Sequence, residues 1–150
     1  MWYFAYASNM NRRQIEARVQ RTLLRWMVAR LDGYALRFNK LSTVNQSGKA
    51  NIVPDESDVV WGVLFELSEE EFQRLARFEA GYSRKTIEVA CGEPAARFSA
   101  ETFVAKPDGS ELLPTSQYLQ IILDGAREHE LQTDYQAQLA GTRTAGNPSS

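Results

Sequence analysis

The stretch that decides the fold is MWYFAYASNM (residues 1–10), at the start of the chain. Apolar and aromatic residues fill its first part without helical spacing, and Ala7, Ser8 and Asn9 then lead into a charged segment. An uninterrupted apolar run of this kind predicts a buried strand. Because small polar residues follow it directly, we expect the backbone to turn there and present N–H groups to a ligand. Capping of the next helix by the same residues is a compatible alternative.

The composition indicates one domain with one hydrophobic core. Of the 150 residues, 43% are hydrophobic, and 17 basic against 19 acidic residues give a net charge of −2. We assign residues 1–140 to this domain and expect the last ten, GTRTAGNPSS (141–150), to be a flexible tail. Since no dense basic block is present, neither nucleic acid nor a membrane is an expected partner. A homodimer is retained as a candidate assembly.

The cysteine and histidine content excludes two common kinds of site. A single cysteine, Cys91, cannot form an internal disulfide, and a single histidine, His129, is too few for a zinc site of cysteine and histidine ligands. We therefore expect no metal or other cofactor. We also expect the protein to reside in a reducing compartment, the cytoplasm. No apolar run approaches the ~20 residues that span a bilayer, and the N-terminus lacks a secretory-signal pattern. We interpret Cys91 as a small buried hydrophobe. We interpret His129 as a surface residue or a partner of a helix C-terminus.

Strands and helices alternate irregularly along the chain, which is typical of an α+β fold. The segment 28–40 predicts two strands joined by a turn at Asp32–Gly33, and 41–57 predicts a loop with a short strand at 50–53. The remaining predicted strands are 58–67, 84–91 and 97–105, and the predicted helices are 10–20, one that starts at Ser68, and two after Pro114. In the first helix, Met10, Ile15 and Val19 are expected to face inward, with Asn9 or Asn11 as the N-cap.

One carboxylate breaks the pattern of the helix that begins after Ser68, where Glu71 completes a capping box. Its inward stripe continues through Leu75 to Glu79, so an acidic side chain falls where a core residue is expected. Burial and the nearby helix C-terminus both raise a carboxyl pKa, which suits general acid–base catalysis near neutral pH. The alternative is that the helix phase drifts and Glu79 points to water.

Several stretches together resemble the γ-glutamylcyclotransferase family. They are YFAYASNM (3–10), VARLDGYALRFN (28–39), ANIVP (50–54) with VVWGVLFELSEEEFQRL (59–75), FEAGY (78–82) and TSQYLQIILDGAREHELQTDYQAQL (115–139). The resemblance implies a small mixed β-barrel with flanking helices. It also implies that the substrate's own α-amine attacks its γ-carbonyl, which gives 5-oxoproline and releases an amine or amino acid. The implied substrates are a γ-glutamyl amine, a γ-glutamyl amino acid or a γ-glutamyl-protected biosynthetic intermediate.

The resemblance also implies roles for individual residues. Glu79 corresponds to the family's catalytic acid–base. The expected substrate-binding residues are Tyr6, Ala7, Ser8, Asn9, Tyr82 and Tyr118. For Tyr118 the alternative is a place in the core or at its rim. Arg84 is either a clamp for a substrate carboxylate or a solvated charge at a strand end.

Ala7 departs from the family pattern, which has glycine at this position. An alanine in the left-handed region costs roughly 1 kcal/mol or more, so we expect Ala7 to have a negative φ or to direct its methyl group toward substrate. The departure supports an alternative function, in which an altered or inactive relative serves as a small-molecule-binding domain.

Overall fold

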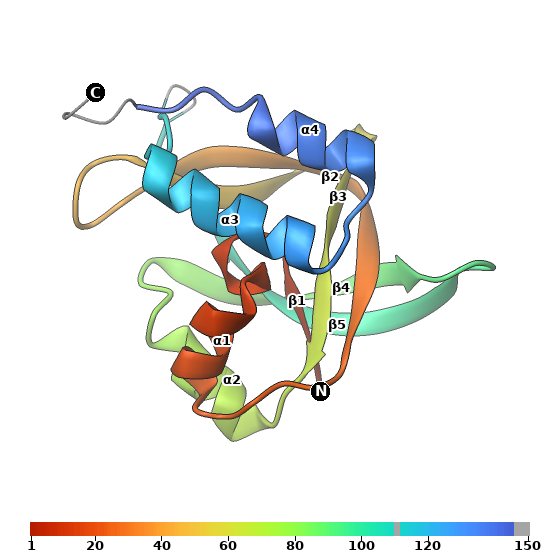
Figure 1. Cartoon of the computed structure of the whole chain (residues 1–150). Coiled ribbons are helices and arrows are strands. Elements are labelled where there is room, and N and C mark those ends of the chain that lie inside the picture. Colours follow the sequence, from red (N-terminus) through yellow and green to blue (C-terminus); the bar gives the residue numbers. More distant parts are fainter. Residues whose placement is uncertain (110–111, 146–150) are drawn as a thin grey trace.

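Five strands close into a barrel, and helices flank it (Figure 1). The computed structural model describes residues 1–109 and 112–145. The strands are β1 (Trp2–Ala5), β2 (Trp26–Leu41), β3 (Gly48–Glu66), β4 (Tyr82–Cys91) and β5 (Ala96–Ala105), and the helices are the 3-10 helix η1 (Ser8–Met10), α1 (Arg12–Val19), α2 (Glu69–Ala76), α3 (Ser116–Glu128) and α4 (Thr133–Ala140). The barrel order is β1-β3-β2-β4-β5, with β1 antiparallel to β3 and parallel to β5. The expected α+β fold, a small mixed β-barrel with flanking helices, is confirmed.

Strand β1 is buried on both faces, as its sequence predicts. Tyr3 and Ala5 belong to the hydrophobic cluster that includes the inner faces of α1, α2 and α3. Phe4 and Tyr6 belong to a second cluster formed by the strands of the barrel. This short strand therefore connects the two clusters, and its end fixes where the following turn lies relative to both.

Strand β2 is a single strand, so the predicted turn at Asp32–Gly33 is wrong. The chain continues in the same direction through Gly33, whose φ is 82°. The pairing of β2 with β3 shifts register between Asp32 and Tyr34. Glycine in this conformation typically marks a β-bulge as well as a hairpin turn, and here it forms the bulge.

Strand β3 begins at Gly48, so the predicted loop over residues 41–57 is also wrong for most of its length. The strand pairs with β2 from Gly48 onward. Its polar residues Pro54, Glu56 and Ser57 are exposed. The polar residues of this segment gave no strand pattern, because this part of β3 is held mainly by backbone pairing with β2 at the exposed end of a long hairpin.

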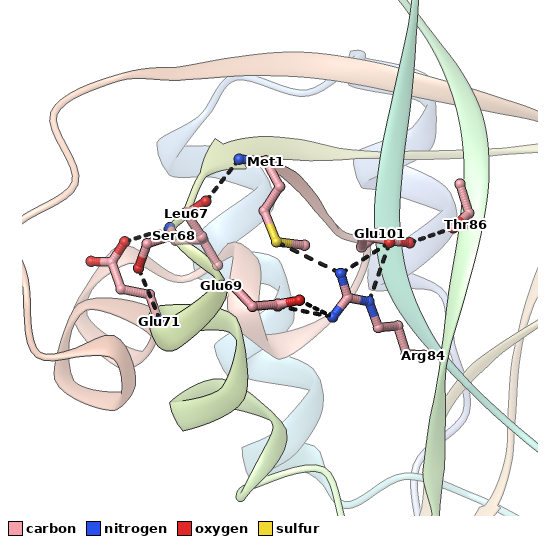
Figure 2. Close-up of polar contacts among 8 residues, drawn as sticks. All are labelled: Met1, Leu67, Ser68, Glu69, Glu71, Arg84, Thr86 and Glu101. Atoms are coloured by element: carbon pink, nitrogen blue, oxygen red, sulfur yellow. Dashed lines mark hydrogen bonds and ion pairs between the residues drawn. The ribbon is translucent and has the colours of Figure 1, made fainter.

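Helices α1 and α2 start at capping residues that the sequence predicts. At α1 the side chain of Asn11 accepts a hydrogen bond of 3.3 Å from the backbone N–H of Gln14. At α2 the side chains of Ser68 and Glu71 each accept a hydrogen bond from the other residue's backbone N–H, at 3.1 and 2.8 Å, which completes the capping box (Figure 2). The predicted inward residues of the first helix are also confirmed as fully buried. They are Met10, Ile15 and Val19.

The first residues after α4 contact the rest of the domain. The backbone N–H of Ala145 donates a hydrogen bond of 2.8 Å to the carbonyl of Pro114. Residues 146–150 of the expected tail lie outside the described residues. Within the described ranges, no helix has both the length and the apolar character needed to cross a membrane.

His129 is buried, so the interpretation as a surface residue is wrong. Its side chain has 0% exposure, and its Nε2 lies 2.8 Å from the carbonyl oxygen of Met10. The rings of Trp26 and Phe65 meet it edge-on, and Nδ1 has no hydrogen-bond partner in the described part of the chain. Burial lowers the pKa of this histidine. The polar neighbours of His129 suggested exposure, but α3 places this side chain against the core.

This burial predicts a pH-dependent stability. The folded state disfavours the imidazolium form of His129. Near and below the ordinary histidine pKa of about 6.5, the unfolded chain therefore binds more protons at this residue than the folded chain does. The free energy of unfolding should therefore fall as the pH decreases through that region, by at most about 1.4 kcal/mol per pH unit. Urea denaturation of the wild type and of His129→Gln between pH 8 and 5 measures this term. Parallel pH dependences for the two proteins would contradict it.

Candidate active site

A small cavity lies where the end of β1 meets the segment that follows α2. It measures about 30 Å³, and its lining includes all seven residues that the sequence assigned to the site, Tyr6, Ala7, Ser8, Asn9, Glu79, Tyr82 and Tyr118. Tyr3, Ala50 and Phe103 complete the lining. Residues from distant parts of the chain are therefore brought together as the sequence predicts.

Glu79 points into this cavity and not to bulk water. It follows the end of α2, where its backbone N–H donates to the carbonyl of Ala76 at 3.0 Å. Its side chain is only 16% exposed, and one guanidinium nitrogen of Arg18 lies 3.7 Å from Oε1. Burial raises the pKa of the carboxyl, an effect that Arg18, Asn9 and Lys49 partly oppose. Glu79 thus combines the two properties expected of a general acid–base, access to a cavity and a raised pKa.

Asn9 connects the turn after β1 to Glu79. Its Nδ2 donates hydrogen bonds to the hydroxyl of Tyr3 at 3.0 Å and to Oε1 of Glu79 at 2.9 Å. Its Oδ1 accepts from Gln14 Nε2 at 3.1 Å and from Arg18 at 3.0 Å. Both donor positions and both lone pairs of the amide are used, so its orientation is fixed. This network holds Glu79 at a defined distance from the turn.

Three of the four tyrosines that line the cavity are among the predicted site residues. The hydroxyls of Tyr6 and Tyr82 donate to the carbonyls of Phe103 and Ala50, each at 2.6 Å. The hydroxyl of Tyr118 instead accepts a hydrogen bond of 3.1 Å from the N–H of Ala50, so its own proton can be donated to another oxygen. Burial raises the pKa of all three tyrosines. They are therefore neutral hydrogen-bonding groups and not bases.

Ala7 has a φ of −137°, so the expected negative φ is confirmed. The backbone turns here without the left-handed conformation that favours glycine. Its carbonyl accepts a hydrogen bond of 3.0 Å from the N–H of Met10, which closes the 3-10 turn. The alanine is thus compatible with the turn that brings Ser8 and Asn9 into the cavity.

Arg84 on β4 is not among the residues that line this cavity, and Figure 2 shows its side chain between Glu69 and Glu101. Its guanidinium bonds to the carboxylate of Glu69 at 2.8 and 2.9 Å and to that of Glu101 at 3.1 and 3.2 Å. The arginine also lies over the ring of Phe72. These carboxylates already pair with Arg84 near the start of β4, which argues against the interpretation of Arg84 as a clamp for a substrate carboxylate.

Sequence reasoning missed three residues near Glu79. Tyr3 was assigned only to the buried strand, yet its hydroxyl reaches Asn9. Arg18 was not singled out, although it lies one helical turn after Gln14 and shares its face, a spacing that could have suggested a joint role. Lys49 lies in the segment that we predicted to be a loop, so no periodicity indicated its position.

A larger cavity, of about 560 Å³, lies elsewhere, between the β2–β3 hairpin and the C-terminal part of the chain. Leu36, Phe38 and Leu139 contribute to its lining, which includes none of the seven predicted site residues. Volume alone therefore does not identify the site. Among the described residues, no group of three or more histidine, cysteine, aspartate or glutamate side chains could hold a metal ion.

The chain is a barrel with a pocket at the end of its first strand, and the pocket contains a carboxylate. Known proteins were compared with this chain in sequence and in structure. A model of the AIG2-like family matches residues 59–139, which is more than half of the chain. Human gamma-glutamylcyclotransferase is 29% identical and the bovine protein 27%, each over 154 aligned positions that cover 91% of this chain and 76% of the relative. A solved structure of a gamma-glutamyl cyclotransferase superposes with a TM-score of 0.88 at 28% identity and covers 98% of this chain and 90% of that chain.

The chain therefore belongs to the AIG2-like family, and the expected membership of the γ-glutamylcyclotransferase family is confirmed. Family and fold together support an activity of the γ-glutamylcyclotransferase type.

The contact between Asn9 and Glu79 gives a direct test of the site's electrostatics. Asn9→Asp keeps the shape of the side chain but places a second carboxylate beside Glu79, and like charges at this distance disfavour ionisation. The apparent pKa of Glu79 should rise by about one unit or more. Carbon-13 NMR titration of the Glu79 carboxyl measures the shift, with Asn45→Asp at an exposed position as the control. An unchanged titration would show that the two side chains are not in contact in solution.

Proposed function

We propose that this protein is a γ-glutamylcyclotransferase that converts a γ-glutamyl compound to 5-oxoproline with release of an amine or amino acid. The observation that carries the proposal is the half-buried carboxylate of Glu79, held by Asn9 in one cavity with Ser8 and Tyr118. The family's reaction needs no nucleophile from the enzyme, because the substrate's own α-amine attacks. Among the described residues, those that line the cavity include no cysteine or histidine.

Glu79 acts on the proton of the attacking amine. An α-amine with an ordinary pKa near 8 is mostly protonated at neutral pH and cannot attack in that form. Glu79 removes one proton, the nitrogen forms a bond to the γ-carbonyl carbon, and a tetrahedral intermediate results. As the bond from that carbon to the departing nitrogen breaks, Glu79 returns its proton to this nitrogen. The ring nitrogen still carries two protons after the attack and loses one of them to the released amine, so the products are a neutral lactam and an ammonium ion. Burial raises the pKa of Glu79, which brings it closer to the pKa of the amine from which Glu79 takes the proton.

The turn after β1 acts on the γ-carbonyl oxygen. Backbone N–H groups of Ala7–Asn9 and the hydroxyl of Ser8 stabilise the negative charge that develops on this oxygen. The hydroxyl of Tyr118, which accepts from Ala50, is a further donor toward the pocket. Binding the glutamyl chain in a bent shape between Glu79 and this turn brings amine and carbonyl together, so part of the rate comes from proximity.

A small-molecule-binding domain without turnover is the second candidate function. Ala7 in place of glycine was the feature that favoured it. A φ of −137° at Ala7 makes glycine unnecessary for this turn, so the departure no longer argues against catalysis. A cytoplasmic location belongs to the proposal and rests on the single cysteine.

The substitution Glu79→Gln tests the proposal. Glutamine can still accept the hydrogen bond from Asn9 but cannot take a proton, so 5-oxoproline release from γ-glutamyl substrates should fall by about 10²–10⁴-fold. Because burial makes the ionised carboxylate unfavourable in the folded state, the denaturation midpoint should stay the same or rise. Mass spectrometry of 5-oxoproline and urea denaturation measure both quantities on one preparation.

The matched control is Glu70→Gln on the exposed side of α2, which should change neither quantity. Loss of stability in Glu79→Gln with full activity per folded molecule would make Glu79 a structural residue. The enzyme would then have no base.

A further inference from the structure

A second cavity, of about 170 Å³, adjoins the first on its outer side. The two cavities share Ser8, Glu79, Tyr82 and Tyr118 in their linings. The first cavity is only large enough for about one water molecule, so a substrate that reaches Glu79 must extend into the second. The residues of the second cavity therefore contact the part of a ligand that lies beyond the reacting atoms.

Three cations line this second cavity, Arg18, Lys40 and Lys49. Lys40 on β2 and Lys49 on β3 are direct cross-strand partners, and like charges placed opposite each other destabilise a sheet. Arg18 lies 3.7 Å from Glu79, and Lys40 lies 3.5 Å from Asp108. Two of the three cations thus have a nearby carboxylate.

Lys49 is the exception among them. It is half-buried, and its ammonium lies 4.2 Å from the centre of the Tyr118 ring. In the part of the chain that the structure describes, no carboxylate lies within 4.0 Å of it. Burial and the charge of Arg18 lower the pKa of Lys49, and the charge of Glu79 opposes them only in part. An anion bound in the second cavity would favour the charged form of this lysine.

We propose that Lys49 is a specificity-determining residue, which selects γ-glutamyl compounds whose leaving amine carries an anionic group, such as the carboxylate of an amino acid. The inference rests on the proposed function, because it assigns the second cavity to the leaving group. The rim of this cavity adds an apolar surface. It includes Leu41, Val44 and Phe78, which are 38%, 87% and 55% exposed. A leaving amino acid with an apolar side chain matches both the cation and this rim.

A pair of substrates that differ only in one charge tests the inference. γ-Glutamyl-leucine has a carboxylate on its leaving group, and γ-glutamyl-leucinamide has a neutral amide in its place. Lys49→Met keeps the length of the side chain and removes the charge, so kcat/KM for γ-glutamyl-leucine should fall about tenfold more than that for the amide, because any effect through the ionisation of Glu79 is common to both substrates. Lys85→Met, an exposed lysine on β4, is the control and should affect neither substrate.

Stability provides a second readout. Because Lys49→Met removes a like-charge pair from the sheet, its denaturation midpoint should not decrease. An equal loss of kcat/KM on both substrates would overturn the inference, since Lys49 would then bind the glutamyl half or support the fold.

Calorimetry separates failure of this inference from failure of the proposed function. Titration of both γ-glutamyl compounds into Glu79→Gln, with and without Lys49→Met, measures binding without turnover. If the wild type releases no 5-oxoproline but binding still favours γ-glutamyl-leucine through Lys49, the proposed reaction fails and the anion site remains. If binding shows no preference for the carboxylate, the inference is wrong whatever the turnover.

Discussion

The hydrogen bond from the amide of Asn9 to the carboxylate of Glu79 is the contact on which the site depends. It joins two residues that are 70 positions apart, one in the turn after β1 and one just after α2. Helices α1 and α2 also pack against each other, so both ends of this bond are held by the same layer (Figure 1). A partly buried hydrogen bond to a charged group is worth about 1.5–3 kcal/mol. It therefore holds Glu79 in position and favours its ionised form, against the larger effect of burial.

On the proposed function, the balance of charge around Glu79 lets one carboxyl both take and return a proton. Burial favours the neutral acid, whereas Arg18, Asn9 and Lys49 favour the carboxylate. On the proposed function, a substrate anion beside Lys49 offsets one of these cations and raises the affinity of Glu79 for a proton while the α-ammonium is bound. Substrate selection and proton transfer are then linked through one lysine.

The sequence predicted most of the site and less of the sheet. Glu79 and the Tyr6–Asn9 turn were identifiable because a helical stripe and an apolar run are local patterns, and the family resemblance connected them. The continuity of β2 through Gly33 could not be predicted, because a positive-φ glycine serves a turn and a bulge equally well. Lys49 was missed for a related reason, since its role depends on cross-strand pairing with Lys40. The burial of His129 was not predicted, because its neighbours in sequence are polar. The end of α3 nevertheless places its ring next to the carbonyl of Met10.

The most direct test of the central claim is a crystal structure of the Glu79→Gln variant with a bound γ-glutamyl compound. The account predicts that the side chain of residue 79 lies within hydrogen-bonding distance of the substrate's α-nitrogen. It also predicts that the γ-carbonyl oxygen faces the backbone of Ala7–Asn9. A ligand bound with its α-nitrogen away from residue 79, or in the larger cavity between the β2–β3 hairpin and the C-terminal part of the chain, would contradict it.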